Sequence, residues 1–97
     1  MQNNKTKIEE IGKRIENLIK EDIKRKNLID TGRLLNSVKA KILIRSGLKF
    51  SIEFETMEYF DFVDKKNNII RDVTNSNSFE KIVDEMREIL FKEYEKE

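Results

Sequence analysis

The chain has 97 residues and a mass of 11.6 kDa, which is the size of one small domain. Lys and Arg number 20 and Asp and Glu number 19, so a chain that is 40% charged has a net charge of only +1. His and Cys are absent, which excludes disulfide scaffolds, zinc fingers, thiol nucleophiles and imidazole bases. No apolar run approaches the length of about 18 residues that a membrane span needs, so no membrane partner is expected.

Charge is balanced over the whole chain but not along it. Residues 1–50 carry 13 Lys and Arg against 6 Asp and Glu, whereas residues 51–97 carry 7 against 13. The simple interpretation is a solvated surface. The alternative is a dipolar molecule whose copies attract each other side to side, as suits a repeating assembly.

Apolar residues at spacings of three and four predict a long helix over Lys5–Lys26. These residues are Ile8, Ile11, Ile15, Leu18, Ile19 and Ile23. The rest of the helix surface is charged, with Glu9 and Lys13, Glu10 and Arg14, and Glu16 and Lys20 in the favourable order for i,i+4 ion pairs. Gly12 lowers the helix propensity of this segment, and it either allows close packing or is simply tolerated. Residues 27–33, rich in capping and turn residues, end the pattern.

Two segments of period two predict a β-hairpin over residues 38–56. In Val38–Arg45 and Lys49–Thr56, every second residue is apolar, and Ser46–Leu48 fits a short hairpin loop with a glycine. The outward faces carry opposite charges: Lys39, Lys41 and Arg45 on the first strand, Glu53 and Glu55 on the second. Opposite charges across a hairpin help to select its register.

The remaining segments are less regular until the last third of the chain. Met57–Val63 is compatible with a short helix or a strand, Asp64–Asn68 with a polar turn or exposed loop, and Ile69–Ile70 with the start of a third, short strand. Phe79, Ile82, Val83, Met86, Ile89, Leu90 and Tyr94 then return to helical spacing. This spacing predicts a second main helix over Ser78–Tyr94, with Asn77 and Glu80 in the spacing of a capping box.

These elements predict a single domain, residues 1–97, of the α+β class. A long N-terminal helix and a C-terminal helix would pack on a small antiparallel sheet containing the β-hairpin. Because such a core is thin for so polar a chain, we expect the domain to associate with copies of itself or with a larger partner.

The residues that remain for catalysis or metal binding are Ser37 with Lys41, and Asp61 with Asp64. A Ser–Lys pair needs a desolvated Lys, but Lys41 lies on the predicted outward face. The two Asp residues lack a further carboxylate at a recognisable spacing, and no P-loop, GxGxxG or GxSxG motif is present. The sequence therefore predicts no enzyme, and no catalytic, cofactor-binding or metal-binding residues.

Nucleic-acid binding would rest on the basic residues of the first helix. Most of them alternate with Glu and Asp, which repel phosphates. Only Lys24–Lys26 is an unmixed basic cluster, and a basic helix C-terminus is explained by the helix dipole. A small cytoplasmic nucleic-acid-binding or regulatory protein therefore stands as the alternative function.

The segment Asp30–Val38 reads DTGRLLNSV. It resembles the motif Asp-Thr-Gly-Arg-Leu-x-x-Ser-Ile of the small tail-completion and head–tail joining (connector) proteins of tailed bacteriophages, in which the motif follows a long N-terminal helix and leads directly into an antiparallel sheet. The matching residues are Asp30, Thr31, Gly32, Arg33, Leu34 and Ser37, with Val38 in place of the final Ile. Tyr59–Asp64 is similar to the Tyr-centred segment of that family, and Ser78–Phe79 to the start of its closing helix. The family's Gly-Thr is replaced here by Lys65–Asn68, and no Pro precedes Phe79.

The resemblance implies a structural virion protein, assembled in the host cytoplasm, that forms a ring of roughly six or twelve copies at the head–tail junction or upper tail. Its partners would be copies of itself and portal, connector or tail proteins, with DNA only passing through the channel and no cofactor. Leu43 and Leu48 are apolar where an outward face or a turn is expected, which favours an interface. The expected assembly contacts are Asp30, Thr31, Gly32, Arg33, Leu34, Ser37, Leu43, Tyr59, Phe62, Lys65 and Asn67.

Overall fold

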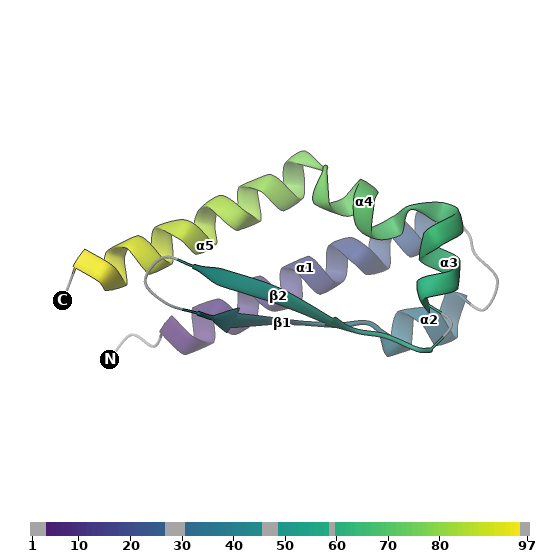
Figure 1. The fold of residues 1–97 in the computed structure, drawn as a ribbon, viewed down its shortest axis with the longest axis horizontal. Helices are drawn as coiled ribbons and strands as arrows, with labels where there is room; N and C mark the ends of the chain where they lie inside the picture. The colour runs from purple at the N-terminus through teal and green to yellow at the C-terminus, as the bar shows by residue number, and fades with distance from the viewer. Residues whose placement is uncertain (1–3, 27–30, 46–48, 59, 96–97) are drawn as a thin grey trace.

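A computed structural model describes residues 4–26, 31–45, 49–58 and 60–95 of the chain (Figure 1). Its elements are α1 (Asn4–Lys26), α2 (Thr31–Ser37), β1 (Lys39–Ile44), β2 (Phe50–Glu55), α3 (Phe60–Asn67), α4 (Ile69–Thr74) and α5 (Asn77–Glu95). The predicted α+β class, with long helices near both ends and a two-stranded antiparallel hairpin, is confirmed.

Helix α1 is the element around which the others are arranged, because it packs against β1, α2, α4 and α5. One isoleucine row runs along its inner side: Ile11, Ile15, Ile19 and Ile23, each at most 3% exposed. Their spacing of four residues keeps them on one stripe of the helix. Ile82, Met86 and Leu90 of α5 are also buried. The two helices run along the length of a molecule measuring 48 × 23 × 19 Å.

The hairpin has the register that its charges predict. Lys39 lies opposite Glu55, and Lys41 lies opposite Glu53. The alternate pairs are apolar: Ala40 with Phe54, Ile42 with Ile52, and Ile44 with Phe50. The sheet consists of β1 and β2 alone, and β1 is the strand that packs on α1. The hairpin is therefore attached to the helices along one of its two edges.

Two local predictions in the middle of the chain are wrong. Ile69 does not begin a third strand but the short helix α4, in which Ile69 and Val73 are buried. The segment 64–68 is not an exposed loop, since α3 continues to Asn67. Both errors have one physical cause. A polar run followed by only two apolar residues is too short a segment for its periodicity to distinguish a strand from a helical turn.

The start of α5 also differs from the prediction. The cap is Ser76, whose Oγ accepts a hydrogen bond from the Phe79 amide at 3.2 Å, while the Glu80 amide donates to the Ser76 carbonyl at 3.1 Å. Ser76 thus occupies the position that the spacing of Asn77 and Glu80 suggested for Asn77, because Ser is an equally good N-cap residue one position earlier.

Candidate functional site

The motif at residues 30–38 forms α2 and leads directly into β1. Leu34 is completely buried and Val38 is 1% exposed. The Ser37 hydroxyl donates a hydrogen bond to the Leu34 carbonyl at 2.8 Å, which closes the end of this short helix. The apolar positions of the motif therefore anchor the junction between the helices and the hairpin in the core.

The other motif residues are placed differently. Gly32 and Arg33 are exposed, and a Cβ added to Gly32 would meet no atom within 4 Å. Thr31 begins α2, whereas Asp30 lies outside the described residues. The structure therefore divides the motif into buried apolar anchors and an outward side formed by Gly32 and Arg33.

Helix α3 carries the most exposed large apolar side chain in the described part of the chain. Phe62 is 62% exposed, and the Lys66 ammonium lies 4.6 Å from the centroid of its ring, within cation–π distance. Lys65 beside it is exposed. We call Phe62, Lys65 and Lys66 the α3 patch. Among the expected contact residues, Phe62 and Lys65 lie in this patch, and Tyr59 lies outside the described residues.

The polar residues around the α3–α4 joint hold the backbone together. The Asn67 side chain donates to the Val63 carbonyl at 2.9 Å. Asp64 accepts a hydrogen bond from the Ile70 amide at 2.8 Å through Oδ1 and so caps α4, while Asn68 adopts the left-handed conformation with φ 55°. The side chains of Asn67 and Asp64 thus stabilise the backbone at the junction of α3 and α4, next to the α3 patch.

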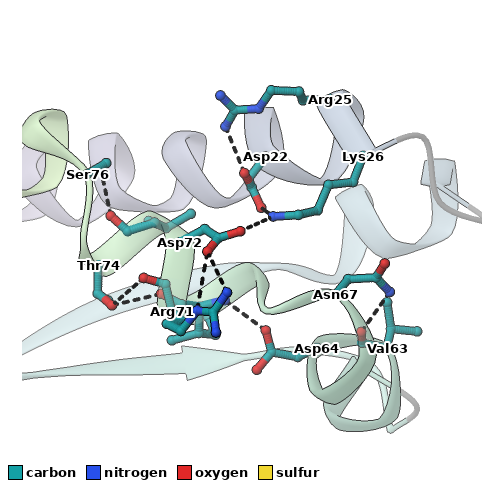
Figure 2. A network of polar contacts seen from close by, with 12 residues as sticks. Asp22, Arg25, Lys26, Val63, Asp64, Asn67, Arg71, Asp72, Thr74 and Ser76 are labelled. Atoms are coloured by element: carbon teal, nitrogen blue, oxygen red, sulfur yellow. Dashed lines mark hydrogen bonds and ion pairs between the residues drawn. The ribbon is translucent and has the colours of Figure 1, made fainter.

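A network of ionic contacts joins the end of α1 to α4 (Figure 2). The Asp22 side chain is 4% exposed and accepts from Arg25 at 2.7 Å and from Lys26 at 2.6 Å. Lys26 also reaches Asp72 of α4 at 2.7 Å. Burial lowers the pKa of Lys26, but hydrogen bonds to both Asp residues outweigh it and raise the pKa above the ordinary value. The Lys26–Asp72 contact thus links the end of α1 to α4.

Glu16 is the second buried acid of α1, with a side chain 6% exposed. Its Oε1 accepts the backbone N–H of Ala40 at 3.1 Å, and its Oε2 contacts Lys13 at 3.0 Å and Lys20 at 3.3 Å. Burial alone would raise the pKa of Glu16, but these hydrogen bonds together hold it below its usual value. The Glu16 carboxylate therefore binds the outer edge of β1 through the Ala40 amide.

Gly12 lies one helical turn before Glu16 and faces the same strand. A Cβ at Gly12 would come within 3.2 Å of the Ala40 carbonyl oxygen. The two residues of α1 thus meet both backbone groups of Ala40. The ion pairs predicted for this helix are confirmed only between Glu16 and Lys20, since Lys13 contacts Glu16 and not Glu9.

Arg14, expected to contact Glu10, instead crosses to α5. It makes two hydrogen bonds with Glu85, at 2.7 and 2.8 Å, and they raise the pKa of Arg14 and lower that of Glu85. This bridge borders a groove of about 310 Å³ between α1 and α5, with Leu18 and Ile82 also in its lining. Its lining combines apolar residues with charges of both signs.

The outward face of the hairpin carries Leu43, which is half-buried and lies opposite Ser51. The Arg45 guanidinium donates to the Ser51 hydroxyl at 3.1 Å. Leu48, the other apolar residue singled out for an interface, lies outside the described residues. Leu43 therefore stands as an isolated, half-buried apolar residue in a polar row, and single apolar residues of this kind are common on protein surfaces.

The Ser37 hydroxyl is occupied by the Leu34 carbonyl, and Lys41 is exposed on the hairpin. Within the described residues, no group of three or more Asp or Glu side chains is arranged to hold a metal ion. In the same residues, no helix is long and apolar enough to cross a membrane.

Comparison with known proteins adds no relative. No protein-family model matches the chain, and neither curated proteins nor solved structures give a match.

Proposed function

We propose that this protein is a structural subunit of a tailed-bacteriophage particle, which forms an oligomeric ring at the head–tail junction or in the upper tail. The observation that carries the proposal is the motif of residues 30–38. It resembles the connector motif in sequence, and it stands between a long first helix and an antiparallel hairpin, which is the order of elements that the resemblance implies.

The division of the motif supports an assembly role. Leu34 and Val38 fasten α2 into the core, so the exposed Gly32 and Arg33 are presented from a fixed position. A backbone held in this way loses little conformational entropy when a neighbouring subunit contacts it, so the entropic cost of the contact comes mainly from the Arg33 side chain. Binding would therefore act through shape and charge, with no chemical step.

The α3 patch supports the same role. An exposed Phe beside two Lys side chains combines a large apolar contact area with charge, and aromatic residues of this kind often contribute most to interface energy. A ring needs two different surfaces on each subunit, because its contacts are heterologous. The outward side of α2 and the α3 patch would belong to such surfaces.

The test is the state of the purified full chain in solution. Light scattering coupled to size-exclusion chromatography and negative-stain microscopy should show a closed ring that forms as the protein concentration rises. A protein that stays monomeric up to millimolar concentration, alone and when mixed with the products of its neighbouring genes, would contradict the proposal. Salt-dependent binding to duplex DNA by that monomer would support the alternative function.

Arg33→Ala should weaken ring formation, because Arg33 is on the exposed side of α2, and a circular dichroism melt of the variant separates this effect from a change in stability. Lys24→Ala is a matched control, since Lys24 is also an exposed basic residue, on α1. Equal assembly of the two variants would remove the motif from the interface.

A further inference from the structure

The two edges of the hairpin are treated differently by the rest of the molecule. The backbone N–H of Ala40 on β1 donates to Glu16, and the Ala40 carbonyl lies against Gly12 of α1. The β1 edge is thus closed by α1. In the part of the chain that the structure describes, no strand pairs with the other edge of β2, which is visible in Figure 1.

The backbone groups that β2 offers at this edge follow from two observed contacts. Because the Ala40 amide points to Glu16, the pair Ala40–Phe54 is a non-hydrogen-bonded pair of the ladder. The Arg45 amide donates to the Lys49 carbonyl, which agrees with this alternation. The N–H and C=O groups of Phe50, Ile52 and Phe54 therefore point away from β1, along the open edge.

The side chains of β2 complete the description of this edge. Phe50, Ile52 and Phe54 are only half-buried on the inner face, because α1 packs on β1. On the outer face, Glu53 and Glu55 are exposed. An added strand would cover the apolar residues and would place its own outward residues beside two carboxylates.

We propose that the open edge of β2 is a binding site for an extended strand of a partner protein, which pairs antiparallel with Lys or Arg opposite Glu53 and Glu55 and apolar residues between them. The structure already contains one strand of this chemistry: β1 places Lys41 and Lys39 opposite the same two Glu residues. The preference for Lys or Arg in the added strand therefore follows from Glu53 and Glu55 of β2 itself. This inference does not depend on the virion role.

The probe is a capped peptide with the sequence of residues 38–45, VKAKILIR, added to the folded full-length protein. At saturating peptide, amide hydrogen exchange should slow at least tenfold at Phe50, Ile52 and Phe54, which are the outward amides. The amides of Ser51 and Glu53, already bonded within the hairpin, should change little. Binding that leaves the outward amides unprotected would mean that the peptide displaces β1 or binds elsewhere, and would overturn the proposal.

Two matched peptides separate edge pairing from nonspecific attraction. A peptide with Lys39→Glu and Lys41→Glu should bind about tenfold more weakly, because like charges then lie opposite Glu55 and Glu53. A peptide methylated on the backbone nitrogens of Ala40 and Ile42 keeps its charge but cannot donate to β2, and it should not bind. Equal binding of either control peptide, or no binding of the parent peptide at millimolar concentration, would overturn the proposal.

Discussion

The Glu16 carboxylate of α1 accepts a hydrogen bond from the backbone amide of Ala40 on β1, 24 residues later in the chain. A side chain thus takes the place of a neighbouring strand at this edge of the sheet. Because the carboxylate is buried and also contacts two Lys residues, the helix and the hairpin are joined by a directed polar contact in addition to apolar packing.

Glu16→Ala should destabilise the protein by about 2 kcal/mol, because it leaves the partly buried Ala40 amide without its acceptor. Glu16→Gln should cost less, since its side-chain oxygen can still accept from Ala40. Urea denaturation measures both values, and hydrogen exchange at the Ala40 amide should accelerate in Glu16→Ala. Glu9→Ala, at an exposed position of the same helix, is the control and should change the stability little.

Stability should fall as the solution becomes acidic. Because the pKa of Glu16 is lower in the folded state than its usual value, its ionised form contributes stability above the unfolded pKa, and this is lost as the pH falls below about 4. Urea midpoints measured between pH 6 and pH 3 should therefore decrease more steeply in the native protein than in Glu16→Gln. The pKa values of Asp72 and Glu85 are also lowered, by Lys26 and Arg14 respectively. The urea midpoint of Glu16→Gln should therefore still decrease with falling pH, but less steeply than that of the native protein.

Gly12→Ala should not give the stabilisation of up to about 1 kcal/mol that Ala normally provides within a helix. The new methyl group would lie 3.2 Å from the Ala40 carbonyl oxygen, which the hairpin and Glu16 hold in place. Gly32→Ala is the matched control, because nothing lies within 4 Å of its Cβ position, and it should stabilise the protein. Thermal unfolding of the two variants tests the difference, and a gain in Gly12→Ala would show that β1 can move away from α1.

Asp22→Ala should destabilise the protein by about 2 kcal/mol, because it removes the buried acceptor of Arg25 and Lys26. Asp84→Ala removes an ion pair of similar spacing, with Arg87, but both of its side chains are about two-thirds exposed, so little change is expected. Equal urea midpoints for the two variants would argue against a structural role for the network in Figure 2.

Two nearby aromatic residues of α3 should respond in opposite ways. Phe60 is 3% exposed, so Phe60→Ala should cost about 3 kcal/mol or more. Phe62 is exposed, and Phe62→Ser should change the unfolding free energy by less than about 0.5 kcal/mol while weakening assembly. Circular dichroism melts and light scattering on the same samples separate the two effects. Unchanged assembly in Phe62→Ser would exclude the α3 patch from the interface.

The regular elements could be predicted because their patterns are long. The isoleucine row of α1 repeats over several turns, and in the hairpin both the apolar alternation and the opposite charges indicate the observed register. The short helices α3 and α4 could not be predicted from such patterns. Each contains only about two turns, which is too few for a helical period to be recognised.

The buried acids could not be predicted in the same way. Glu16 and Asp22 lie among many charged residues of α1, and their burial depends on β1 and on the end of α1 meeting other elements. The spacing of Gly12 and Glu16 was the one local signal, because it places a small residue and an acceptor on one side of the helix. The exposure of Phe62 does not follow from the apolar residues around it, and the family resemblance alone singled out Phe62 as a contact residue.

The position of α1 between the hairpin and α5 has a consequence for synthesis on the ribosome. The isoleucine row is among the first parts of the chain to be translated, whereas Ile82, Met86 and Leu90 of α5 are among the last. Until these α5 residues emerge from the exit tunnel, one side of the isoleucine row lacks its native contacts. The nascent chain then exposes an apolar surface about three helical turns long. The native covering of this row by α5 can therefore form only at the end of translation.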